Sequence, residues 1–145
     1  MKAINVEFHN LACAETRIDT KEFFKTLLSI ERQVFEDGLY KNGPTVIETN
    51  LSTFGQQGTY DYKFYVPVNA QVDANEDFTY VKHLVLNNIY ANRVPFDENF
   101  RDSLNHLSEA LEEDGLKQKG DKIYLVMFPV YKDYFVDIML PFEGE

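Results

Sequence analysis

The chain has 145 residues, with 14 Lys and Arg against 24 Asp and Glu, so its formal net charge is −10. This balance argues against a nucleic-acid partner, because binding a polyanion requires basic side chains that neutralise phosphates. A negatively charged surface suits a cationic ligand or a basic protein better. The same charge is also explained if its only role is to keep the protein soluble. Cys13 is the only cysteine, which excludes an intrachain disulfide. The sequence shows neither an apolar leader nor a membrane-spanning apolar run, so we expect a cytoplasmic protein without membrane contact.

The first half of the chain predicts a strand, a helix and two further strands. Residues 3–18 begin with alternating apolar and polar side chains, as in a half-buried strand. Asp19 and Glu22 have capping-box spacing, which predicts the start of a helix. Its apolar stripe consists of Phe23, Leu27, Ile30 and Val34. Gly38 stands where a helix ends, and the two strands are expected at residues 44–49 and 59–69.

The second half predicts the same order of elements. Residues 78–94 are typical of a strand, with a bend near Asn87 and Asn88. Asp97 is expected to cap a helix that ends at Gly115. Its apolar stripe consists of Phe100, Leu104, Leu107 and Leu111. The closing pair of strands is expected at residues 122–130 and 134–142.

An internal repeat supports this division. The run Glu36-Asp37-Gly38-Leu39 recurs 77 positions later as Glu113-Asp114-Gly115-Leu116. We therefore expect one domain over residues 1–145, built from half-repeats at about 3–70 and 78–142, because a unit of about 70 residues buries too little surface alone. The predicted fold class is α+β: duplicated β-α-β-β units form an antiparallel sheet, with two long helices packed on one face about a pseudo-two-fold axis.

The ends of the two halves resemble a known family. The run from Asp137 to Phe142 has the form acid, three apolar residues, Pro, apolar, and Gly43-Pro44 precedes a short strand. This pattern resembles the GyrI-like domain, the effector-binding domain of several bacterial transcription regulators, which also occurs alone. The resemblance implies a pocket between the two halves, over the sheet and between the helices, for a small apolar or cationic molecule. Because the repeat occupies the chain, a stand-alone form is expected.

Five residues are candidates for this pocket: Asp137, Lys63, Tyr65, Tyr124 and Glu48. Asp137 matches the position at which the family carries a pocket acid. Its repeat partner is Lys63, where the family commonly has a second acid, so an ion pair between Lys63 and Asp137 would neutralise the site. Alternation places Lys63 and Tyr65 on one face of their strand. If that face is solvated, these are ordinary surface positions. Glu48 and Tyr124 could line the same cavity, but such residues are more often a sheet-edge charge and a core tyrosine.

Other function classes have less support in the sequence. A protein-interaction module, such as a chaperone or immunity-like partner of a basic protein, is the alternative, and the acidic charge, Lys63 and the absence of tryptophan favour it. An enzyme is less expected, because the sequence contains no catalytic motif and no cofactor fingerprint. No cofactor is therefore predicted. It would require Asp137 or Glu48 with a raised pKa beside a tyrosine hydroxyl. The three histidines show no metal-ligand spacing, so no metal site is expected.

Overall fold

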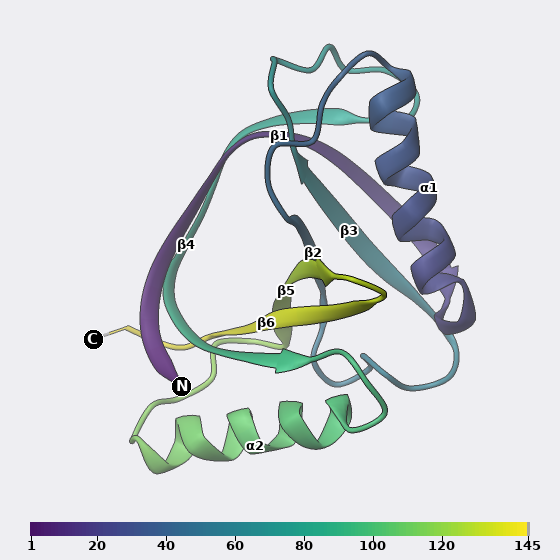
Figure 1. Cartoon of the computed structure of the whole chain (residues 1–145). Coiled ribbons are helices and arrows are strands. Elements are labelled where there is room, and N and C mark those ends of the chain that lie inside the picture. The colour runs from purple at the N-terminus through teal and green to yellow at the C-terminus, as the bar shows by residue number, and fades with distance from the viewer. Residues whose placement is uncertain (145) are drawn as a thin grey trace.

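The computed structural model describes residues 1–144, which form six strands and two α-helices (Figure 1). The strands are β1 (Lys2–Asp19), β2 (Thr45–Asn50), β3 (Thr59–Pro67), β4 (Thr79–Pro95), β5 (Lys122–Val130) and β6 (Asp133–Pro141). The helices are α1 (Phe23–Glu36), preceded by a single 3-10 turn η1 (Thr20–Glu22), and α2 (Phe100–Glu113). The predicted elements are confirmed to within a few residues at their ends. No helix among residues 1–144 is long and apolar enough to cross a membrane.

All neighbouring strands run antiparallel, in the order β1-β3-β2-β5-β6-β4, and β4 pairs back with β1. The predicted antiparallel α+β class is confirmed, but the closure of the sheet into a barrel was not predicted. Two residues let the long strands β1 and β4 curve together around the barrel (Figure 1). Asn10 and Asn88 adopt left-handed backbone angles, with φ of 59° and 57°. Asparagine tolerates this conformation better than most residues. The bend expected at Asn88 is confirmed, whereas the bend at Asn10 was missed.

Both helices cover the outer face of the sheet. Alternate strand residues such as Ile47, Phe64 and Leu125 are fully buried on this face. They pack against Leu27 of α1 and Leu107 of α2, which are 1% and 0% exposed. Each such aliphatic side chain contributes about 1.5–3 kcal/mol when it is fully buried. This packing fixes which strand face the helices cover, and it leaves the opposite, inner face for a second cluster.

The helix ends follow the sequence signals with two corrections. Asp97 does not cap α2, whose N-cap is Asn99; the side chain of Asp97 accepts a hydrogen bond from the backbone N–H of Asn99 at 2.9 Å. The side chain of Asp19 accepts a hydrogen bond from the backbone N–H of Lys21 at 2.9 Å, and Glu22 makes no side-chain cap. The expected capping box is therefore wrong, since the intervening η1 delays α1 to Phe23. At the other ends, Gly38 and Gly115 have φ of 84° and 76°. Glycine adopts such angles without steric cost.

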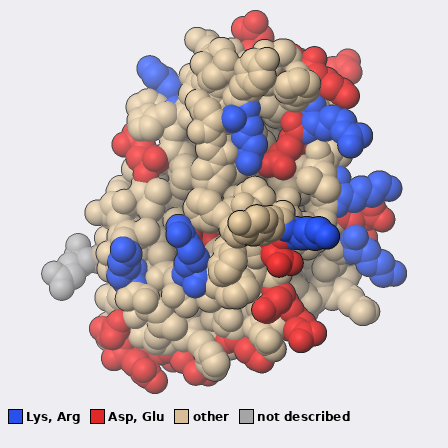
Figure 2. Space-filling model, in the orientation of Figure 1, with Lys and Arg blue, Asp and Glu red and all other residues tan. Residues whose placement is uncertain are grey.

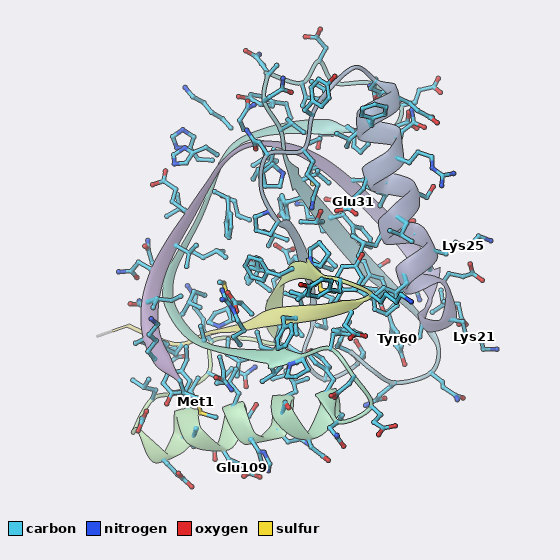
Figure 3. The ribbon with its side chains drawn as sticks, viewed as in Figure 1. Met1, Lys21, Lys25, Glu31, Tyr60 and Glu109 are labelled. Atoms are coloured by element: carbon cyan, nitrogen blue, oxygen red, sulfur yellow. The ribbon has the colours of Figure 1, made fainter. Side chains whose placement is uncertain are left out.

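Charged side chains are unevenly placed on the surface. Acidic groups gather along the lower edge of the molecule, over α2 (Figure 2). The exposed acids there are Asp102, Glu109, Glu112, Glu113 and Asp114. Glu31 is an exception among the charged residues of α1, because its side chain points toward the sheet (Figure 3). It accepts a hydrogen bond from the hydroxyl of Thr45, a fully buried residue, at 2.6 Å and pairs with Lys41 at 3.1 Å.

Candidate ligand site on the inner face of the sheet

The structure places the five candidate residues on four strands. Glu48 lies on β2, Lys63 and Tyr65 on β3, Tyr124 on β5 and Asp137 on β6. Their chain neighbours, among them Ile47, Phe64, Leu125 and Ile138, belong to the core beneath the helices. Because successive side chains of a strand point to opposite faces, the five candidates lie on the inner face, away from the helices. The expectation that Lys63 and Tyr65 share one face of their strand is therefore consistent with the register.

The location expected for the pocket needs correction. The resemblance implied a pocket over the sheet and between the helices, but that space holds a packed core that includes Phe23 and Phe100. A hollow of about 300 Å³ remains there, at the N-terminal ends of the helices. Its lining residues include none of the five candidates: Thr20, Phe23, Phe24, Phe54, Gly55, Tyr62, Phe96, Asp97, Glu98, Phe100 and Arg101. Any site built from the candidates must instead open on the inner face.

Register brings three of the candidates side by side. Glu48 of β2 lies directly opposite Lys63 of β3 on one side and Tyr124 of β5 on the other. Directly opposed side chains in antiparallel strands are within contact distance. The hydroxyl of Tyr65 donates a hydrogen bond to Oε1 of Glu48 at 3.2 Å. Glu48 is therefore the residue around which this group is arranged.

Lys122 completes the group, although the sequence analysis did not name it. Its Nζ lies 2.9 Å from Oε2 of Glu48, whose side chain is only 13% exposed. Lys122 precedes Tyr124 by two positions on β5, so alternation alone puts both on one face. Its partner could be identified only from the pairing of β2 with β5, in which Glu48 lies opposite Tyr124.

The electrostatics of this group fix its protonation states. Burial alone would raise the pKa of Glu48, but the hydrogen bond and charge of Lys122, with help from Tyr124 and Lys63, lower that pKa overall. Burial first, and then the nearby charge of Glu48, raise the pKa of Tyr65 and of Tyr124 above the usual tyrosine range. At neutral pH the group thus consists of an ionised carboxylate, two neutral phenols that can donate hydrogen bonds, and two lysine side chains, of which Lys63 also pairs with Glu15.

Lys63 and Asp137 do not form the ion pair that the sequence suggested. Nζ of Lys63 lies 3.2 Å from Oε1 of Glu15, its partner on β1. Asp137 pairs instead with Arg93 of β4. Strands β2 and β5 lie between β3 and β6, which separates the two residues by about 14 Å along the sheet, at about 4.8 Å per strand. Strand order therefore decides these pairings.

Two hollows adjoin the group around Glu48. The first, of about 520 Å³, is lined by Glu15, Thr16, Arg17, Glu48, Thr49, Asn50, Asp61, Tyr62, Lys63 and Lys122. The second, of about 970 Å³, includes Lys122 and Tyr124 in its lining and extends toward Asn88 and Phe142. Lys122 contributes to both hollows, whereas Asp137 lines neither. Four of the five candidates are thus brought together, and Asp137 is set apart with Arg93.

Comparison with known proteins supports the fold. No family model and no curated protein matches the sequence. Among solved structures, the C-terminal domain of EcmrR matches with a TM-score of 0.69 at 14% identity, covering 99% of this chain and 98% of that one. The EcmrR chain in a DNA complex matches with a TM-score of 0.66 at 14% identity, over 99% of this chain but 58% of the longer one.

A third similarity is weaker. The structure of SAV2435 bound to tetraphenylphosphonium matches over 99% of this chain and 95% of its own, with a TM-score of 0.46 at 6% identity. The similarity to the EcmrR domain extends over nearly the whole of both chains. Together with the antiparallel sheet and its two helices, it shows that this chain has a GyrI-like fold.

Proposed function

We propose that this chain is a small-molecule-binding domain whose ligand contacts Glu48, Lys63, Tyr65 and Tyr124. The observation that carries the proposal is the carboxylate of Glu48, largely buried beside a hollow of about 520 Å³ and hydrogen-bonded to Tyr65 and Lys122. Concave sites with a few converging polar groups among apolar walls are typical of ligand pockets. The hollow itself is lined mainly by polar and charged side chains, and the apolar inner-face cluster, which includes Val46, lies beside Glu48 on the same strand.

The proposed ligand is apolar with a cationic group. Nζ of Lys122 occupies the position beside Glu48 that a ligand ammonium or phosphonium would take. The side chain of Lys122 is 57% exposed, so it can swing into solvent at small cost when a ligand arrives. The hydroxyls of Tyr65 and Tyr124 would keep the carboxylate oriented while the cation is exchanged. The ammonium of Lys122 thus pairs with Glu48 at the place where the ligand's positive charge would lie.

We further propose that residues 1–145 form one domain made of two copies of a single unit, as the sequence repeat indicates. The order strand, helix, strand, strand occurs twice, as β1-α1-β2-β3 and β4-α2-β5-β6. Asn10 and Asn88 bend the first strand of each unit, and Gly38 and Gly115 end the two helices. The central strand pair of the proposed site, β2 with β5, joins the two units, so the ligand would lie between them.

Glu48 does not meet the main requirement of the enzyme hypothesis. It needed a carboxyl group with a raised pKa, able to donate a proton at neutral pH. The pKa of Glu48 is lowered instead, so the group is ionised and suits cation recognition. The interaction-module hypothesis has no comparable observation in its favour at this site.

The proposal is tested by calorimetric titration with three probes of similar size and different charge. Tetraphenylphosphonium is the cation, triphenylphosphine oxide the neutral compound and tetraphenylborate the anion. We expect the cation to bind most tightly, and Glu48→Gln to weaken it at least tenfold while leaving the neutral compound within twofold. Asp61→Asn is the matched control, because Asp61 lines the same hollow but pairs with Arg17 at its rim. Equal affinity for all three probes, or no binding, would refute the proposal.

A further inference from the structure

A second polar cluster lies outside the proposed ligand site, on strands β1 and β4. Glu7 and His9 of β1 and His83 of β4 each offer one ligand atom, and these atoms all lie within 4.8 Å of one another. Oε1 of Glu7 is 3.1 Å from Nδ1 of His83 and 3.6 Å from Nε2 of His9. The two imidazole rings meet edge to face with centroids 4.6 Å apart.

The antiparallel register assembles this cluster from residues far apart in sequence. His9 and His83 are directly opposed in the β1–β4 ladder, and Glu7 is the diagonal neighbour of His83. Glu7 and His9 are two positions apart on one strand, so they share a face. The expectation of no metal site relied on spacing along the chain, and it did not consider this cross-strand pairing.

The cluster faces solvent, while the other side of the same strands is packed. Phe8 and Leu84, which alternate with Glu7, His9 and His83, belong to the inner-face cluster. The side chains of Glu7, His9 and His83 are 45%, 60% and 46% exposed. An ion in solution can therefore reach all three ligand atoms without any opening of the barrel.

We propose that Glu7, His9 and His83 bind a divalent transition-metal ion, with Zn²⁺ the preferred occupant. Two imidazole nitrogens and one carboxylate oxygen are a donor set that suits zinc, at bonds of about 2.0–2.2 Å. A tetrahedral ion with such bonds places its ligands about 3.3 Å apart. The observed separations reach this value after small rotations of exposed side chains. Three protein ligands leave a fourth position for water.

The bound ion would tie the two halves of the chain together, because β1 belongs to the first and β4 to the second. Such an ion binds the folded chain and not the unfolded one, in which residues 9 and 83 are far apart. It should therefore raise the melting temperature, and above its dissociation constant the rise should follow the logarithm of the ion concentration. Mg²⁺, which prefers oxygen ligands, provides the comparison ion.

The first measurement is a thermal melt of the untagged protein at pH 7.5 with increasing Zn²⁺ or Mg²⁺. We expect Zn²⁺ to raise the melting temperature by several degrees and Mg²⁺ to leave it unchanged. His83→Asn and His9→Asn should each abolish the zinc shift, and Glu7→Gln should weaken zinc binding at least tenfold. His106→Asn is the matched control, since His106 is the third histidine and is exposed on α2.

The second measurement uses the three histidines as separate reporters in proton NMR. Substoichiometric Cu²⁺ should broaden the imidazole signals of His9 and His83 together and leave those of His106 sharp. Equal broadening of all three histidines would overturn the proposal. A zinc-induced shift that persists in the double variant His9→Asn/His83→Asn would also overturn it, because the ion would then bind elsewhere.

Discussion

Arg93 holds Asp137 through two parallel contacts, with Nε 2.7 Å from Oδ1 and Nη2 3.0 Å from Oδ2. The two residues are directly opposed on β4 and β6, and the guanidinium also lies over the ring of Phe128 at 4.7 Å. This two-point geometry satisfies both oxygens of the carboxylate. Asp137 was expected to be a pocket acid, but Arg93 already occupies its acceptor atoms.

We therefore expect Asp137→Asn to leave the affinity for tetraphenylphosphonium within twofold of the parent protein. Titration calorimetry, with Glu48→Gln measured in parallel, checks this difference between the two acids. A tenfold loss on Asp137→Asn with Glu48→Gln unaffected would assign the pocket acid to Asp137 and reject the proposed arrangement.

Lys122→Gln should increase the affinity for tetraphenylphosphonium severalfold. The substitution removes the ammonium 2.9 Å from Oε2 of Glu48, which a cationic ligand must otherwise displace. Lys119→Gln is the control, because it removes the same charge from an exposed position lining the neighbouring hollow. The same gain from both variants would indicate a general charge effect on the surface, whereas a loss of affinity in Lys122→Gln would contradict displacement.

The stability of the protein in acid should depend on Lys122. The folded chain lowers the pKa of Glu48, so the ionised group contributes stability above the unfolded pKa of about 4.3. That contribution is lost as the pH falls through the lower, folded value. Lys122→Gln removes the principal cause of the lowering, so its melting temperature should be lower at pH 7 and should fall less between pH 6 and pH 3 than that of the parent protein. Melting curves between pH 3 and 7 measure this, and coincident profiles for the two proteins would contradict it.

Glu31→Ala should destabilise the chain by about 1–3 kcal/mol, because it leaves the hydroxyl of the fully buried Thr45 without its acceptor. Glu31→Gln keeps an acceptor oxygen and should cost less. Glu36→Ala, at an exposed position on the same helix, is expected to stay within about 0.5 kcal/mol. Urea unfolding measures all three, and equal losses for Glu31→Ala and Glu36→Ala would show that the Thr45 contact contributes little.

Local patterns in the sequence predicted the elements well. Strand β1 begins with alternating apolar and polar residues, β4 is rich in β-branched and aromatic residues, and both helices carry an apolar stripe followed by a glycine that ends them. These signals act over a few residues, so a single sequence contains them in full. The 3-10 turn at Thr20–Glu22 was missed, because the same capping residue, Asp19, suits either kind of helical turn.

Strand pairing could not be predicted in this way. Glu48 meets Tyr124 and Lys122, and His9 meets His83, only because of an order of strands that no local pattern specifies. Alternation placed Lys63 and Tyr65 on one face of their strand, but which side of the sheet the helices cover is decided by packing across the whole sheet. For the same reason Lys63 and Asp137 were paired with each other rather than with Glu15 and Arg93.

The closed order of strands also affects how the chain is made. A nascent chain that ends before Thr79 can pair β3 with β1 and with β2, but the outer edges of β1 and β2 have no partner until β4 and β5 emerge. Unpaired strand edges attract other unfinished chains. The long first strand, Lys2–Asp19, is thus the segment most in need of protection during synthesis, and the interval between translation of β1 and β4 sets the period of that risk.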